Sequence, residues 1–100
     1  MTTNIQFVKM PTSETLTEFT NKRIKKLAVK YNWIIHTEVF FKLDTDAFGT
    51  KICEMELSVP GPKIFASSKD DNFEVAVKHT ITELEKQLKK RKEVTFRLNH

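Results

Sequence analysis

Two segments in the middle of the chain alternate between apolar and polar residues with a period of two. In residues 35–43 the odd-numbered positions are mostly apolar, and residues 52–59 repeat the pattern after the turn-like sequence DTDAFGT. Successive side chains of a strand point to opposite faces of a sheet, so the pattern predicts an antiparallel pair with one apolar and one solvated face. The solvated face would carry Glu38, Phe40, Glu54 and Glu56.

Two flanking segments instead space their apolar residues by three and four positions, as amphipathic helices do. The first follows Ser13, a good N-terminal cap, and should end at Asn32, while the second opens at the sequence KDDN. The candidate caps of the second helix are Asp70, Asp71 and Asn72. The inner stripes are Leu16, Phe19, Ile24, Leu27 and Tyr31 in the first helix and Phe73, Val77, Ile81, Leu84 and Leu88 in the second.

The β-prone segments NIQFVKM (4–10) and KIFAS (63–67) complete the element order β-α-β-β-β-α. PGP at 60–62 predicts a tight reversal before the fourth strand, since proline fixes φ and glycine tolerates positive φ. Neither helix has another apolar surface on which to bury its stripe. The sequence therefore predicts a single α+β domain with two helices packed on one face of a four-stranded sheet.

Length and composition fit one small domain. The 100 residues are 39% hydrophobic and 30% charged, which is typical of a globular chain with one modest core. We assign residues 1–93 to the domain and 94–100 to a short C-terminal tail, VTFRLNH, which could pack on the sheet edge, fray or dock on a partner. No apolar run approaches the roughly 20 residues of a membrane span, and no signal-peptide pattern opens the chain. With Cys53 as the only cysteine, we expect a cytoplasmic protein.

Positive charge is concentrated in two short windows. The net charge is +4, yet residues 22–30 hold five basic side chains and residues 86–92 another five, with no acid in either window. Two such runs in one helix layer favour a polyanion-binding surface over the alternative of two merely solvated helix faces. The candidate RNA-binding residues are Lys22, Arg23, Lys26 and Lys30 on the first helix and Lys78, Lys86, Lys89 and Lys90 on the second.

Other polar and aromatic residues are weaker candidates. Thr82 and Gln87 could add hydrogen bonds to phosphate or ribose, although Gln87 could equally pack near the core edge. Tyr31 and Trp33 could stack on an exposed base, but such aromatics more often close a core. Phe40, on the solvated face, could mark a contact site or be an ordinary exposed apolar residue.

The sequence carries no pattern for catalysis, a metal or a cofactor. His36, His79, His100 and Cys53 fall on a strand, a helix and the tail without the spacing of metal ligands. Cys53 alternates into the apolar face, which favours a buried, inert thiol. The two glycines form no phosphate-cradling loop, and no nucleophile, base and acid are placed together. We therefore predict a protein that is not an enzyme and needs no cofactor.

The chain resembles the ribosome hibernation promoting factors, also called ribosome-associated inhibitor or light-repressed-type proteins. The resemblance spans about residues 4–93 and rests on the element order, SETLTEFTNKRIKKL in the first helix, the strand ELSVPG and, above all, IFASSKDDNFEVAVKHTITELEKQLKKRKE. Its most specific parts are the strand-to-helix junction AS…D-N-F…AV and the ending L-x-x-Q-L-x-K, which comprises Leu84, Gln87, Leu88 and Lys90.

The resemblance implies a domain similar to double-stranded-RNA-binding domains. It implies binding to the small ribosomal subunit in the channel for mRNA and tRNAs, which blocks translation and protects idle ribosomes under stress. By position, Arg23, Lys26, Lys86 and Lys90 match basic residues that contact small-subunit rRNA in the family. The chain resembles the short form without a second domain, so we do not expect it to pair ribosomes alone, and a second hibernation factor is a possible further partner.

Two functional hypotheses follow from these patterns. The favoured one is a translation inhibitor that binds small-subunit rRNA through a basic two-helix surface, with neither a small-molecule substrate nor a membrane as its partner. The alternative is a protein-interaction module that uses the exposed sheet face and the C-terminal tail, with the lysines serving only solubility. Binding to ribosomes at low and at high salt would distinguish the two hypotheses. Phosphate contacts release counterions, so the first hypothesis predicts strong, salt-sensitive binding, whereas the second predicts little binding at either salt concentration.

Overall fold

The chain folds into the six elements that the sequence predicts, in the predicted order. The computed structural model describes residues 1–46 and 49–98, and for residues 95–98 it describes the backbone alone. The elements are β1 (Thr2–Phe7), α1 (Glu14–Lys30), β2 (His36–Leu43), β3 (Lys51–Ser58), β4 (Ile64–Asp70) and α2 (Phe73–Leu98).

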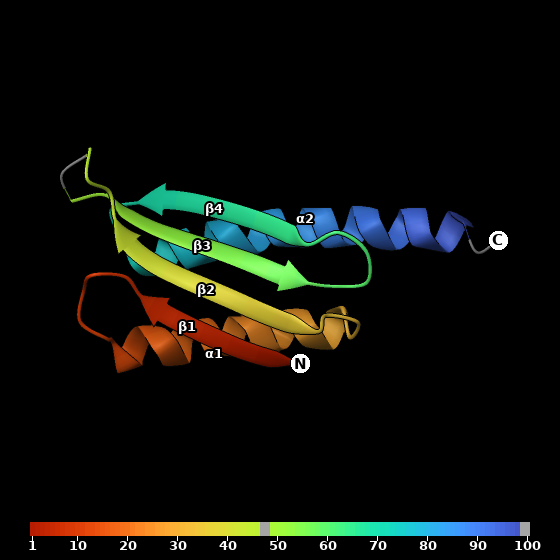
Figure 1. Ribbon diagram of the computed structural model, residues 1–100, viewed down its shortest axis with the longest axis horizontal. Coiled ribbons are helices and arrows are strands. Elements are labelled where there is room, and N and C mark those ends of the chain that lie inside the picture. Colours follow the sequence, from red (N-terminus) through yellow and green to blue (C-terminus); the bar gives the residue numbers. More distant parts are fainter. Residues whose placement is uncertain (47–48, 99–100) are drawn as a thin grey trace.

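The strands form one sheet in the order β1-β2-β3-β4. β1 and β2 pair in parallel, so the chain must cross over between them, and α1 makes this connection. β2, β3 and β4 pair in antiparallel fashion through short reversals. Both helices lie behind the same face of the sheet, α1 near β1 and β2 and α2 near β3 and β4 (Figure 1). The predicted α+β architecture is confirmed.

The core lies between the sheet and the helix layer. The inward positions of β2 and β3 are fully buried over residues 37–41 and 53–57, as the period of two predicts, and Cys53 is among them. Leu43, at the end of β2, is 52% exposed instead. Burial raises the pKa of the Cys53 thiol to about 12, because a thiolate would be poorly solvated there. The thiol is thus unreactive near neutral pH, as expected for a buried structural cysteine.

Several element boundaries differ from the predicted ones for local reasons. β1 ends at Phe7 rather than at residue 10, and Lys9 has a φ of 54°, which an extended strand does not accommodate. β4 continues to Asp70, three residues beyond KIFAS. Asn72 is the cap of α2, since its side chain accepts hydrogen bonds from Glu74 N at 2.7 Å and Val75 N at 3.3 Å.

Helix α1 begins and packs nearly as predicted. The hydroxyl of Ser13 accepts a hydrogen bond from Leu16 N, which confirms the N-cap, and the helix ends at Lys30, two residues before Asn32. Thr20, which the predicted inner stripe omits, is fully buried, however, whereas Phe19 is only partly buried. Phe19 lies one helical position away, about 100° around the axis, and covers the edge of the core.

Thr20 offers a stability test because its buried hydroxyl has no hydrogen-bond partner within the described residues. The variant Thr20→Val keeps the shape and removes a desolvated hydroxyl, so we expect the free energy of unfolding to rise by about 1 kcal/mol. Thr80 is the matched control, since its buried hydroxyl lies 2.8 Å from Ala76 O and 3.3 Å from Cys53 O. Thr80→Val should lower the free energy of unfolding by about 1 kcal/mol. Urea denaturation followed by circular dichroism measures both changes, and destabilisation by Thr20→Val would contradict the first.

Helix α2 is the longest element and extends past the end of the sheet (Figure 1). It continues to Leu98, so residues 94–98 of the expected tail are helical, while residues 99–100 lie outside the described part of the chain. Arg91 ties the extension to the β3–β4 reversal through a hydrogen bond of 3.1 Å to Pro60 O. Gly61, in that reversal, has a φ of 89°, and a Cβ there would lie only 3.3 Å from Arg91 Nη1.

Candidate nucleic-acid interface

The excess positive charge of the molecule lies in the helix layer. Helix α1 carries five basic and two acidic residues, and α2 carries seven basic and four acidic residues, which gives the two helices a net charge of +6. The four strands together carry three basic and four acidic residues, a net charge of −1. The predicted division into a basic helix layer and a sheet without excess positive charge is therefore present.

The two helices run side by side in the same direction (Figure 1). Side chains of both helices line a groove between them. Its first hollow, of about 220 Å³, is lined by basic residues of α1 and by Ile81 and Glu85 of α2. Its second hollow, of about 550 Å³, lies beside the last turns of α2 and also contains Tyr31 and Glu93. We call this feature the interhelical groove, and its charged residues are Arg23, Lys26, Lys30, Glu85, Lys89, Lys92 and Glu93.

Three predicted residues stand in the interhelical groove with their charge unpaired. Within the described ranges, Arg23, Lys26 and Lys89 form no ion pair with a carboxylate. The guanidinium of Arg23 is instead held 4.8 Å from the centroid of the Phe19 ring, a cation–π geometry that orients it without neutralising it. These cations remain available to an anionic partner.

Lys30 differs, because it forms an ion pair across the interhelical groove. Its Nζ lies 2.5 Å from Glu85 Oε1, and the Lys30 and Glu85 side chains are 63% and 37% exposed. The hydrogen bond to Glu85, followed by the charge of that carboxylate, raises the pKa of Lys30 above its ordinary value. The acid-free windows of the sequence therefore do not produce an acid-free surface.

The other four predicted residues lie outside the interhelical groove. Lys90 faces β4, where it lines a separate hollow of about 350 Å³ with Ile64, Gln87, Arg91 and Val94. Lys86 is exposed and pairs with Glu83 at 3.1 Å, one turn away on the same helix. Lys22 and Lys78 are exposed. The predicted set is thus spread over more than one surface of the helix layer.

Lys92 belongs to the interhelical groove although it was not among the predicted site residues. It follows Lys89 by three positions, so both side chains project from the same side of α2. This spacing is the signal that could have identified it. Lys92 lines the second hollow with Lys30 and Lys89.

Two weaker candidates use their donors within the protein. Gln87 donates a hydrogen bond of 2.8 Å from Nε2 to Phe65 O on β4, and the Thr82 hydroxyl donates to Lys78 O at 2.9 Å. Tyr31 is only 3% exposed and packs in the core, with Trp33 edge-on at a ring distance of 6.0 Å. The core interpretation of these two aromatics is confirmed.

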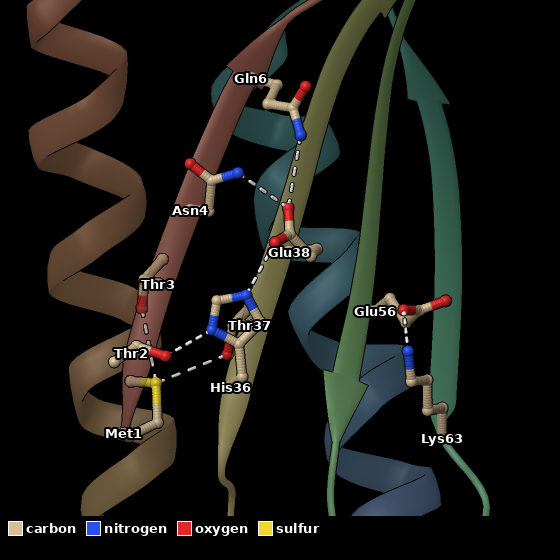
Figure 2. Close-up of polar contacts among 10 residues, drawn as sticks. All are labelled: Met1, Thr2, Thr3, Asn4, Gln6, His36, Thr37, Glu38, Glu56 and Lys63. Carbon is tan, nitrogen blue, oxygen red and sulfur yellow. Dashed lines mark hydrogen bonds and ion pairs between the residues drawn. The ribbon is translucent and has the colours of Figure 1, made fainter.

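The opposite face of the sheet is largely polar, and the negative charges of its glutamates are paired with basic side chains. Figure 2 shows Glu38 at the centre of a network, with Asn4 Nδ2 at 3.1 Å and His36 Nε2 at 2.7 Å. The hydrogen bond with His36, followed by that from Asn4, lowers the pKa of Glu38 below its ordinary value. The remaining glutamates of this face are paired as well, Glu54 with Lys42 and Glu56 with Lys63.

The described residues contain neither a candidate metal site nor a candidate membrane-spanning helix. Within residues 1–46 and 49–98, no group of three His, Cys, Asp or Glu side chains could hold a metal ion. In the same ranges, neither helix is both long and apolar enough to cross a lipid bilayer.

Fold and surface together define an α+β protein with a cationic groove suited to a polyanion. The family model described as "Sigma 54 modulation protein / S30EA ribosomal protein" matches residues 3–95, so the chain belongs to this family. It is a family of ribosome-associated hibernation factors, which are not enzymes. The predicted family and the predicted absence of enzymatic activity agree with this membership.

Solved structures share the fold at low sequence identity. A ribosomal subunit interface protein from Coxiella burnetii superposes with a TM-score of 0.84 at 24% identity, over 93% of this chain and 99% of that chain. The N-terminal domain of Protein Y from Thermus thermophilus gives a TM-score of 0.74 at 17% identity, over 89% and 93% of the two chains. A comparison with curated protein sequences gave no significant match.

Proposed function

We propose that this protein inhibits translation by binding rRNA of the small ribosomal subunit in the channel that otherwise holds mRNA and tRNAs. It would act in the cytoplasm on resting or stressed ribosomes, alone or beside a second hibernation factor. No small molecule and no membrane takes part. The proposal makes the interhelical groove the centre of the RNA contact, with Lys22, Lys78, Lys86 and Lys90 as outlying phosphate contacts.

The observation that carries the proposal is the row of unpaired cations along the interhelical groove. Arg23 and Lys26 from α1 and Lys89 from α2 stand on opposite walls, although 63 positions separate Lys26 from Lys89 along the chain. A surface of this kind suits the phosphate backbone of structured RNA, which is recognised mainly by shape and charge. Membership in a ribosome-associated family independently supports a partner on the ribosome.

Ribosome co-sedimentation at two salt concentrations tests the proposal. If about four phosphates are contacted, affinity for isolated small subunits should fall roughly a hundredfold between 50 and 200 mM salt. Isolated large subunits are the control and should bind more weakly at both concentrations. Little binding to small subunits at either concentration would instead favour the alternative, a protein-interaction module on the sheet face and tail.

Competition with mRNA and tRNA tests whether the protein binds in the channel or on another rRNA surface. Small subunits preloaded with mRNA and initiator tRNA should bind the protein at least tenfold more weakly than empty subunits, because the proposed site is then occupied. Equal binding to empty and loaded subunits would place the protein outside the channel.

A further inference from the structure

The ion pair between Lys30 and Glu85 lies at the junction of the two hollows of the interhelical groove. Both residues line both hollows. Arg23 and Lys26 line the first hollow only, and Lys89 lines only the second. The Glu85 carboxylate is therefore an anion held among cations at the middle of the groove, where a continuous polyanion would have to pass.

We propose that Glu85 occupies the position of a phosphate group in the free protein, and that a bound phosphodiester strand displaces it from Lys30. This inference rests on the proposed function and deepens it. Lys30 exchanges one anionic oxygen for another and so keeps a charge-assisted hydrogen bond. The two hollows then form one continuous path for a single nucleic-acid strand.

Opening the Lys30–Glu85 pair costs little free energy, because the pair is exposed. Within the described residues, Lys30 is the only ion-pair partner of Glu85, and both side chains are substantially exposed. Exposed pairs of this kind contribute little to stability, so opening the pair does not endanger the fold. The released carboxylate can turn to solvent, since it is already 37% exposed.

The exchange would also make the interhelical groove selective for polyanions over small anions. A single small anion gains little at Lys30, because it must compete with a carboxylate that is always present at high local concentration. A strand of consecutive phosphates engages the cations on both sides of the pair at the same time, so it can displace Glu85. The groove should therefore prefer RNA strands over isolated phosphate or carboxylate ions.

The variant Glu85→Gln tests the inference with a nearly isosteric, neutral side chain. Its affinity for isolated small ribosomal subunits at 0.1 M salt should rise about 3- to 5-fold, since Lys30 no longer exchanges partners. The slope of log affinity against log salt should stay nearly the same as in the wild type, because Lys30 contacts a phosphate in both bound states and the number of neutralised phosphates is unchanged. Fluorescence anisotropy of a labelled protein titrated with subunits measures both quantities.

Glu56→Gln is the matched control. It removes the same charge from the solvated face of the sheet, where Glu56 pairs with Lys63 at 3.2 Å and the two side chains are 38% and 63% exposed, nearly as in the Glu85 pair. Its affinity should change by less than about twofold, because the only effect is on net charge. The double variant Lys30→Gln/Glu85→Gln should lose the gain of Glu85→Gln, which ties the effect to Lys30.

The outcomes separate this inference from the proposed function. If the wild-type protein binds subunits but Glu85→Gln binds no more tightly than Glu56→Gln, the exchange is overturned and the proposed function stands. Weaker binding by Glu85→Gln, with an unchanged melting temperature, would show that Glu85 positions Lys30 and would overturn the exchange too. Absence of binding by the wild-type protein overturns both.

Discussion

The triple variant Arg23→Glu/Lys26→Glu/Lys89→Glu should lose co-sedimentation with small ribosomal subunits. The three reversals change the net charge by six units, from +4 to −2. They also place carboxylates on both walls of the interhelical groove, so attraction to phosphate becomes repulsion at each of the three positions. Since each attractive phosphate interaction is replaced by a repulsive one, we expect affinity at 0.1 M salt to fall by at least about 10³-fold.

A control with the same net charge distinguishes the groove from bulk electrostatics. Lys9, Lys25 and Lys63 are exposed and line neither hollow of the groove. Their simultaneous change to Glu also gives a net charge of −2 but leaves the interhelical groove intact. This control should keep binding within about tenfold of the wild type, because only long-range attraction is reduced. Equal loss of binding in the two triple variants would contradict the assigned surface.

Most of the fold could be predicted from the sequence because it follows from local periodicity. The alternation in β2 and β3 identified their buried positions, including Val39 and Met55, and helical spacing identified Leu84 and Leu88. Both helices then had to pack on the one apolar face of the sheet, because neither had another surface on which to bury its apolar stripe. The element boundaries were less predictable. β1 ends just before Lys9, whose φ of 54° is incompatible with an extended strand, and a lysine at this position does not reveal that conformation in the sequence.

The candidate site was only partly predictable, because it depends on how two helices approach each other. Arg23, Lys26 and Lys89 were predicted to be close, and the structure brings them to one groove. The sequence did not indicate that Glu85 would reach Lys30, 55 positions away. It also could not assign Lys90 to the β4 side, since that requires the orientation of α2 over the sheet. Such proximities arise from tertiary packing and leave no local pattern.

Residues 94–98 show a further limit of pattern reading. The sequence VTFRLNH was assigned to a separate tail with several roles left open, yet the chain remains helical to Leu98. Five residues are too few to distinguish a period of two from helical spacing. Continuity with a strongly helical segment was the better guide, because extending a formed helix requires no new nucleation.

The variant Phe41→Ala should destabilise the fold more than any other single change proposed for this protein. Phe41 is fully buried in β2, and its ring packs against Phe7 of β1 at 5.2 Å and Phe73 of α2 at 5.3 Å between centroids. Truncation therefore opens a cavity where two strands and a helix meet. We expect the free energy of unfolding to fall by about 3–5 kcal/mol, and the melting temperature by at least about 12 °C.

Phe65→Ala provides the comparison, because it removes the same ring from the other side of the sheet. Phe65 is 52% exposed in β4 and lies opposite Glu56 on the solvated face. Its loss should change the free energy of unfolding by less than about 1 kcal/mol. Thermal and urea denaturation of the two variants measure this contrast directly. Comparable destabilisation by both would mean that the solvated face is packed against something in solution, whereas a small effect of Phe41→Ala would contradict the assigned core. Because the interhelical groove exists only when both helices are held on the sheet, Phe41→Ala should also weaken ribosome binding as the protein unfolds, although Phe41 lines neither hollow of the groove.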